Sequence, residues 1–239
     1  ESFRIQNRGG KGLKGVATKD EDSPQSIVTC FSKDRLLIFT NLGRVYGLKA
    51  WETPQGSRHS RGTHIRNLLE NLQDDEDIVS ILPISKDIVD EVTEKCLKVK
   101  LEEGEKRPSS GYFLLFATKL GLIKKTDLHE YVRINRNGKY ALRFKLENDS
   151  LVNVQQSVDT DDVVMISTTG YASRFKCEAI RTSGRVSGGV YGIKVADRKG
   201  SGGGFVAGML AMSDSDSQIL TISKYGMAKR SRLGTADKV

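Results

Sequence analysis

Four segments of the chain repeat one pattern of hydrophobic and polar positions. Each begins with an apolar run rich in Leu, Ile, Val and Phe, passes through a short polar turn with one glycine, and ends in a run where basic residues alternate with others. Glycine adopts the positive φ of a tight hairpin turn at little steric cost. The pattern therefore predicts four β-hairpins. They are 36–49, 113–126, 163–176 and 218–231, with turn glycines Gly43, Gly121, Gly170 and Gly226.

A second element recurs downstream of the first three hairpins. It is a basic stretch ending in glycine, at 57–62, 133–138 and 181–189, and a strand-like run follows each stretch. Further short apolar runs lead into the next hairpin. Repeated units of about four strands are typical of propeller-like folds, in which small sheets are arranged radially. We expect an all-β fold of repeated four-stranded antiparallel blades.

The spacing of the hairpins predicts one domain over 1–239. The blades are expected at about 1–70, 71–150, 151–200 and, as a partial unit, 201–239. The interval from Gly43 to Gly121 is 78 residues, against 49 and 56 for the next two, which indicates an insertion at 83–111. Because the last hairpin ends close to residue 239, we expect an incomplete ring.

Charge narrows the range of partners. The chain has 38 Lys and Arg against 30 Asp and Glu, a formal charge of +8, which favours a polyanionic partner. The three cysteines, Cys30, Cys96 and Cys177, form no Cys-x-x-Cys pair, which fits a reducing compartment. No secretory signal pattern and no apolar run of about 20 residues is visible. We expect a cytoplasmic, nucleoid-associated chain with no membrane partner.

A search for catalytic chemistry finds no supported site. The stretch 9–12 lacks the Gly-Lys-Ser/Thr ending of a phosphate-binding loop. His59, His64 and His129 have no partners at zinc-ligand spacing. The tyrosines occupy strand positions that favour packing. We expect no catalytic residue, no metal and no cofactor.

Basic residues remain as the candidate binding groups. In a radial fold, equivalent loops fall on the same edge of successive blades, so recurrent basic loops would form a curved positive stripe. Such a stripe neutralises phosphates without reading sequence. The candidate DNA-binding residues are Arg58, Arg61, Arg133, Arg136, Lys139, Arg181 and Arg185 in the loops, and Arg44, Lys49, Lys124, Lys125, Arg174, Lys176, Lys229, Arg230 and Arg232 in the outgoing runs.

The stretch 6–12, Gln-Asn-Arg-Gly-Gly-Lys-Gly, closely resembles the signature box of the C-terminal domain of the bacterial DNA gyrase A protein, normally Gln-Arg-Arg-Gly-Gly-Lys-Gly. The runs 39–46, 60–63 and 116–126 also resemble that family. The departure is Asn7, which stands where the family has an arginine and removes one charge. The resemblance adds Gln6, Asn7, Arg8, Gly9, Gly10, Lys11 and Gly12 to the candidate DNA-binding residues.

The resemblance implies a β-pinwheel, a propeller variant that wraps duplex DNA around a basic rim. It implies a non-catalytic domain of an ATP-hydrolysing enzyme that introduces negative supercoils. The implied partners are double-stranded DNA, the breakage-reunion domain and the gyrase B protein. Two alternatives stay open: the C-terminal DNA-binding domain of the paralogous topoisomerase IV protein, and a β-propeller scaffold that binds another protein.

Overall fold

All four expected hairpins are present in the structure, a computed structural model that describes residues 8, 26–57, 60, 62–102, 104–195, 204–213, 217–223 and 225–232. Their turn glycines have positive φ, from 73° at Gly43 to 93° at Gly121. The hairpins confirm the assignment made from the repeated pattern. They are β1 (Arg35–Thr40) with β2 (Arg44–Lys49), β4 (Phe113–Thr118) with β5 (Leu122–Asp127), β8 (Asp162–Ser167) with β9 (Ala172–Lys176), and β12 (Gln218–Ile222) with β13 (Ala228–Arg232).

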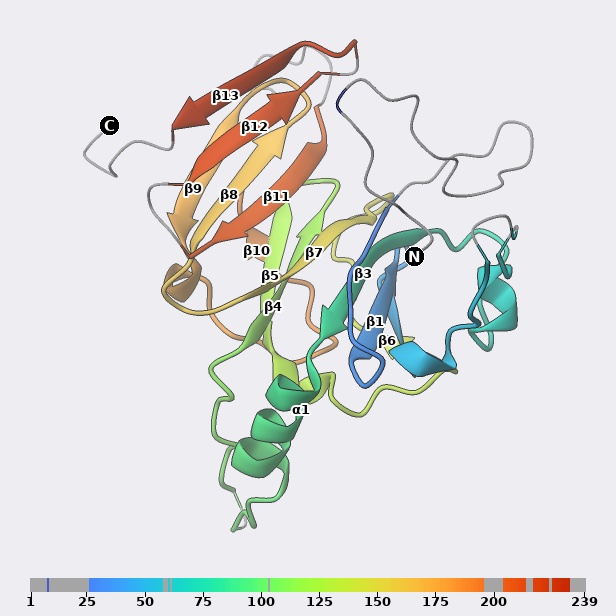
Figure 1. Cartoon of the computed structure of the whole chain (residues 1–239). Helices are drawn as coiled ribbons and strands as arrows, with labels where there is room; N and C mark the ends of the chain where they lie inside the picture. Colours follow the sequence, from blue (N-terminus) through green and yellow to red (C-terminus); the bar gives the residue numbers. More distant parts are fainter. Residues whose placement is uncertain are drawn as a thin grey trace.

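Further strands extend three of these hairpins into sheets (Figure 1). One strand that follows in sequence pairs with the first strand of each hairpin, and in two sheets a two-residue strand pairs with the second. The orders are β3-β1-β2-β6, β10-β5-β4-β7 and β11-β8-β9. The added strands are β3 (Ile78–Ile84), β7 (Leu151–Ser157) and β11 (Val206–Met212), with the short β6 (Lys139–Tyr140) and β10 (Val190–Tyr191).

The sheets are not contiguous in sequence, which differs from the expected blade segments. β3 falls in the expected segment 71–150 but pairs with β1, and β6 follows the second hairpin but pairs with β2. Hydrogen bonds to the turn glycines fix the short strands β6 and β10 on these sheets. The Gly43 carbonyl accepts hydrogen bonds from two amides just after β6, and the Gly121 carbonyl accepts from two amides just after β10. Each of these short strands is therefore bound to the sheet of the preceding hairpin.

The sheets stack face to face, with β7 lying against both β3 and β11. One core cluster lies between the first two sheets and includes an edge-to-face pair of Phe39 and Phe116, with ring centroids 5.5 Å apart. A second cluster joins the second and third sheets. All six residues of β4 are buried because its sheet is covered on both faces. Within the described residues no strand pairing links the first sheet to the last, so the stack is open.

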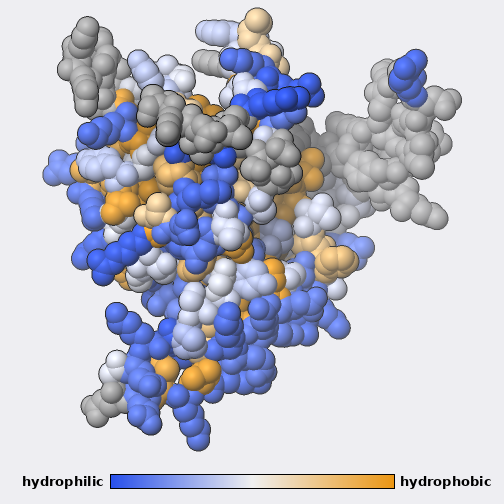
Figure 2. All heavy atoms as spheres, turned by 90° about the vertical axis from the view of Figure 1, so that its left-hand side faces the viewer, coloured by the Kyte–Doolittle hydropathy of each residue, from blue (hydrophilic) through white to orange (hydrophobic). Residues whose placement is uncertain are grey.

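The expected insertion at 83–111 contains a helix, α1 (Lys86–Val92), that continues into a π-helical turn, η3 (Thr93–Leu97). The Ser85 side chain caps it by accepting from the Ile88 amide, and Val92 and Cys96 join the core between the first two sheets. Figure 2 shows mostly hydrophilic side chains over this lower part of the molecule. Short 3-10 turns occur at η1 (Ala50–Glu52), η2 (Ile65–Asn67), η4 (Leu128–Glu130) and η5 (Cys177–Ala179).

Candidate DNA-binding surface

Two of the basic loops pack at equivalent places on neighbouring sheets. The Gly47 amide of β2 donates to the Asn135 carbonyl of the 133–138 loop at 3.2 Å. In the next sheet, the Ser183 amide of the 181–189 loop donates to the Lys125 carbonyl of β5 at 2.9 Å. Gly47 and Lys125 each stand four residues after their turn glycine. The two loops therefore lie on the same edge of successive sheets.

The 133–138 loop and β6, the strand after it, present three exposed cations. Arg133 and Lys139 have no ion pair or side-chain hydrogen bond in the part of the chain that the structure describes. Arg136 lies 3.2 Å from Glu52 and keeps 46% of its side-chain surface exposed. All three remain accessible to a phosphate.

The second loop presents Arg181 and Arg185 differently. Arg181 is exposed. Arg185 is 25% exposed, and its guanidinium donates to the Tyr140 carbonyl of β6 at 2.7 Å and lies 4.0 Å from Glu130. Arg185 thus holds the second loop against the strand that follows the first loop. This contact ties the two loops together along the edge.

Lys124 and Lys125 were expected at the DNA surface, and the structure corrects both. Only 1% of Lys124 and 3% of Lys125 is exposed, because the 181–189 loop covers β5. The Lys124 ammonium donates to the carbonyls of Ala141 and Arg185, and Lys125 pairs with Asp159. Burial, and secondarily the nearby Arg185 charge, lowers the pKa of Lys124 to about 7. These lysines hold the loop and do not face solvent.

Arg44 also needs correction as a surface cation. Its side chain is 13% exposed and lies 3.1 Å from the fully buried Glu76 carboxylate. Glu76 also accepts from the hydroxyls of Thr40 at 2.6 Å and Tyr46 at 2.9 Å. The acidic turn 74–77 thereby neutralises Arg44 and fixes the edge of the first sheet.

The remaining described candidates lie on outgoing strands or at their ends. Arg174 and Lys176 of β9 lie 2.9 and 3.2 Å from Asp162, and the Arg174 hydrogen bond is the main cause that lowers the pKa of Asp162. Lys49 is exposed next to Trp51. In β13, Lys229, Arg230 and Arg232 are exposed.

Several candidates from the sequence belong to the signature box, 6–12, or to the basic loop 57–62. Arg8 is exposed in a turn. The others lie outside the described residues. They are Gln6, Asn7, Gly9, Gly10, Lys11, Gly12, Arg58 and Arg61.

The sequence reasoning missed three exposed cations beside the basic loops. Arg143 and Lys145 follow β6, and Lys194 follows β10. The Lys145 ammonium donates to the Gly189 carbonyl and so reaches the second loop. Alternation of basic and apolar residues over 142–145 was the available signal, but it lies outside the repeated loop pattern.

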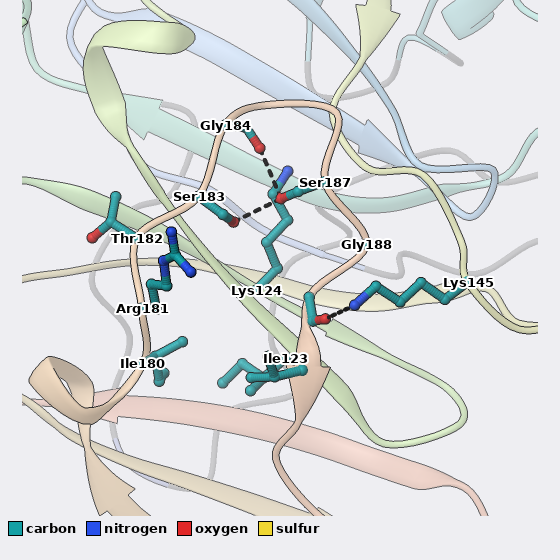
Figure 3. A pocket seen from close by; sticks show the side chains of 12 residues that line it. Ile123, Lys124, Lys145, Ile180, Arg181, Thr182, Ser183, Gly184, Ser187 and Gly188 are labelled. Carbon is teal, nitrogen blue, oxygen red and sulfur yellow. Dashed lines mark hydrogen bonds between the residues drawn. The ribbon is translucent and has the colours of Figure 1, made fainter. Parts of the chain in front are cut away.

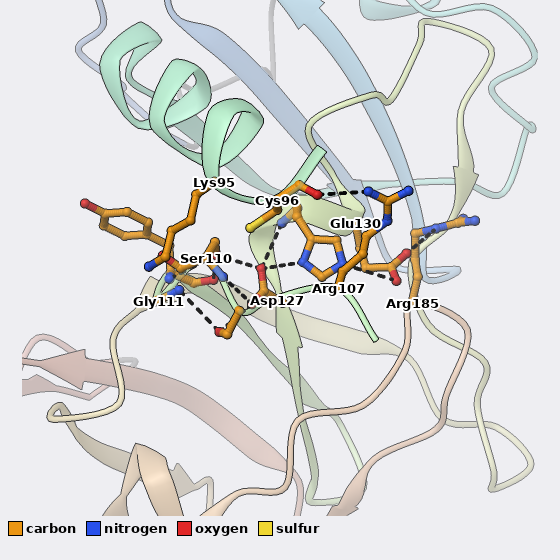
Figure 4. Close-up of polar contacts among 11 residues, drawn as sticks. Lys95, Cys96, Arg107, Ser110, Gly111, Asp127, Glu130 and Arg185 are labelled. Atoms are coloured by element: carbon orange, nitrogen blue, oxygen red, sulfur yellow. Dashed lines mark hydrogen bonds and ion pairs between the residues drawn. The ribbon is translucent and has the colours of Figure 1, made fainter. Parts of the chain in front are cut away.

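A buried carboxylate anchors the end of the insertion next to this edge (Figure 4). Asp127 accepts from the hydroxyl and amide of Ser110 at 2.6 and 2.9 Å and from the ring and amide of His129 at 2.8 and 3.0 Å. Burial alone would raise the pKa of Asp127, but these hydrogen bonds outweigh it and hold the pKa well below its usual range. The neighbouring Glu130 lies 4.0 Å from Arg185, so this hydrogen-bonded cluster around Asp127 also supports the 181–189 loop.

Among the residues that the structure describes, no three His, Cys, Asp or Glu side chains gather in a way that could hold a metal ion. No helix in the same residues is long and apolar enough to cross a membrane.

Comparison with known proteins decides the family. The sequence matches the DNA gyrase C-terminal domain, a β-propeller, over residues 1–29, 34–85, 112–157 and 161–201. The DNA gyrase A protein of Staphylococcus epidermidis (strain ATCC 12228 / FDA PCI 1200) is 36% identical over 230 residues, and that of Staphylococcus aureus (strain MRSA252) is 35% identical. The chain belongs to the DNA gyrase C-terminal domain family. The family match passes over 86–111, where the helical insertion lies.

Solved structures agree with the fold of this gyrase family. The C-terminal domain of DNA topoisomerase IV aligns with a TM-score of 0.65 at 22% identity, covering 84% of this chain and 54% of that one. The DNA gyrase A C-terminal domain aligns with a TM-score of 0.63 at 20% identity, covering 96% and 64%. Against the two staphylococcal gyrase A proteins the chain is covered over 96% of its length but spans only 23% of theirs. The match is to the C-terminal domain of gyrase, which is not the catalytic part of that topoisomerase.

Proposed function

We propose that this chain binds duplex DNA without sequence specificity and wraps it with a fixed handedness along the edge that carries the basic loops. The observation that carries the proposal is the equivalent seating of the 133–138 and 181–189 loops on successive sheets. In a whole gyrase, such wrapping would enable ATP-dependent negative supercoiling. The partners would be the breakage-reunion domain and the gyrase B protein, in the bacterial cytoplasm.

Electrostatics supports a long, bent ligand over a small one. Cations spaced along successive sheets each neutralise a phosphate and release counterions. Bending 20–30 bp by 40–90° costs on the order of 1 to 6 kcal/mol, so many contacts must share that cost. The curved stack of sheets supplies repeated contacts, and no described element has the form of a groove-reading helix with base-specific side chains.

The topoisomerase IV alternative has weaker support. The solved C-terminal domains of topoisomerase IV and gyrase A share the fold at 22 and 20% identity and do not separate the two, whereas the family match and the relatives at 36 and 35% identity are gyrase. Exposed apolar side chains such as Tyr140, Val190 and Tyr191 do lie at this edge, but they lie among accessible cations, which favour DNA over a protein partner.

The 133–138 loop and the adjoining Lys139 offer a direct test of DNA binding. Replacing Arg133, Arg136 and Lys139 by Ala is expected to weaken duplex binding more than tenfold at 0.1 M salt and to reduce the slope of log K against log salt by about 2 to 3. Fluorescence anisotropy with a labelled duplex measures both. The matched control replaces the exposed Lys98, Lys100 and Lys106 of the insertion by Ala, which removes the same charge. Equal losses in the two variants would show that binding follows net charge and not the loop edge.

A further inference from the structure

The 181–189 loop joins the first two sheets at their loop edge, because it is bonded to both. On the second sheet, the Ser183 amide donates to the Lys125 carbonyl of β5 at 2.9 Å, and the loop then continues into β10. On the first sheet, the loop contacts the segment 139–145, which begins with β6. These contacts between the loop and 139–145 are called the cross-sheet joint below.

Three basic side chains form the cross-sheet joint, and all of them donate to backbone carbonyls. The Arg185 guanidinium donates to the Tyr140 carbonyl of β6 at 2.7 Å. Lys124 reaches the joint from β5 and donates to the carbonyls of Ala141 and Arg185. Lys145 donates to a carbonyl at the far end of the loop (Figure 3). The joint therefore uses cations that charge alone would assign to DNA.

Two arginines of this loop are used differently. The Arg185 side chain is 25% exposed, and it lies between the Tyr140 carbonyl of the first sheet and the Glu130 carboxylate that follows the second, 4.0 Å away. Arg181 is exposed and has no ion pair or side-chain hydrogen bond within the described part of the chain. Arg181 is therefore free to contact a phosphate, whereas Arg185 is already bound within the protein.

The cross-sheet joint fixes the relative placement of the two basic loops. The core clusters hold the faces of neighbouring sheets together, and the joint holds the loop edges of the first and second sheets. In repeat folds, the overall curvature and twist follow from a small rotation between successive units. A duplex whose contacts are offset along the strands from one sheet to the next winds with one handedness, whereas a duplex without that offset only bends.

We propose that Arg185 is a positioning residue that sets the offset between the basic loops of the first and second sheets, and thereby the linking-number change that each bound chain imposes on DNA. The inference rests on the proposed wrapping. It gives different roles to two arginines of one loop, because Arg181 contributes affinity and Arg185 determines the path. Affinity and linking-number change can then be altered separately.

The two arginines are compared by ligating nicked plasmid in the presence of the chain. The linking-number change per bound chain reports the path, and the salt dependence of duplex affinity reports the phosphate contacts. Arg185→Ala is expected to halve the linking-number change per bound chain and to leave the salt slope near that of the parent chain. Arg181→Ala is expected to lower the slope by about 0.9, the value for one phosphate contact, with the change per bound chain unaltered.

Gly188 allows the joint to be displaced without a change of charge. A Cβ at Gly188 would lie 2.5 Å from Cγ of Lys145 and 2.7 Å from the Arg143 carbonyl oxygen, so alanine must push the loop away from 139–145. Gly188→Ala is therefore expected to alter the linking-number change per bound chain at an unchanged salt slope. Gly184→Ala is the matched control in the same loop, because a Cβ there meets nothing within 4 Å. Thermal melting followed by circular dichroism checks that each variant is folded at the assay temperature.

The outcomes separate the joint from the wrapping. If Arg185→Ala lowers the salt slope as much as Arg181→Ala and keeps the parent's linking-number change per bound chain, Arg185 is a phosphate contact and the inference is wrong while the wrapping stands. The inference is also wrong if Arg185→Ala and Gly188→Ala both give the parent's change per bound chain. If the parent chain itself shifts no topoisomers, the proposed wrapping fails and this inference fails with it.

Discussion

Gly121→Ala is expected to destabilise the fold by roughly 3 to 5 kcal/mol, the range of large single-residue effects. Gly121 has φ of 93°, and a Cβ there would lie 2.1 Å from the Ile193 carbonyl oxygen. That oxygen belongs to the backbone just after β10, where the amides of Gly192 and Ile193 donate to the Gly121 carbonyl at 2.9 and 3.2 Å. Relief of the clash requires this backbone to move away from Gly121, which weakens those hydrogen bonds. Urea unfolding followed by circular dichroism measures the loss.

Gly170→Ala is the matched control for this substitution. Gly170 has φ of 86°, but a Cβ there would meet nothing within 4 Å. It therefore carries only the cost of a left-handed non-glycine residue, about 1 to 3 kcal/mol. A loss of unfolding free energy for Gly121→Ala no larger than that for Gly170→Ala would show that the contact between Gly121 and the backbone after β10 adds nothing to stability.

Lys124 is expected to make the stability of the fold rise with pH between about 7 and 9. The pKa of this amine is lowered from 10.5 to about 7 in the folded chain. Below pH 7 the amine is charged in both states, and the cost of burying its charge is fully present. Above pH 7 the unfolded state keeps the proton and the folded state does not, so stability rises by up to about 1.4 kcal/mol per pH unit. Over two units the gain is about 2 to 3 kcal/mol.

Lys124→Met is expected to remove this rise. The neutral amine can still donate to the Ala141 and Arg185 carbonyls, whereas methionine leaves both without that donor. The variant is therefore less stable than the parent chain at pH 9, and the stability difference between parent and variant shifts in favour of the parent from pH 7 to 9. Lys100→Met removes an exposed lysine as a comparison. A stability difference between parent and Lys124→Met that stays constant over this interval would contradict the low pKa.

The hairpins were predictable because each carries its own signal. An apolar run, a turn glycine and an outgoing run lie next to one another in sequence, and the turn requires the positive φ that glycine permits. The partners of β2 and β5 were not predictable, because β6 and β10 have two residues each and no periodicity. Their place depends on hydrogen bonds to Gly43 and Gly121, which link residues far apart in sequence.

The candidate site was predictable at the loops and less so at the strands. Arg133 and Arg181 are exposed as expected, because turns ending in glycine stay at the surface. Lys124 and Lys125 belong to an outgoing run that alternates like a surface strand, yet the loop of the next repeat buries it. Arg44 is masked by Glu76 of the acidic turn 74–77, which lies 32 residues away in sequence. Burial by a later segment leaves no local signal in the sequence.

The most direct test of the central claim is the linking number of DNA closed in the presence of this chain. Nicked circular plasmid is incubated with the chain at several salt concentrations, ligated, stripped of protein and resolved as topoisomers. Chiral wrapping predicts a shifted distribution that fades as salt rises and shrinks when Arg8 and Lys11 are both replaced by Ala. Plasmid that is bound, as shown by a mobility shift, but gives the same topoisomers as plasmid alone would contradict wrapping.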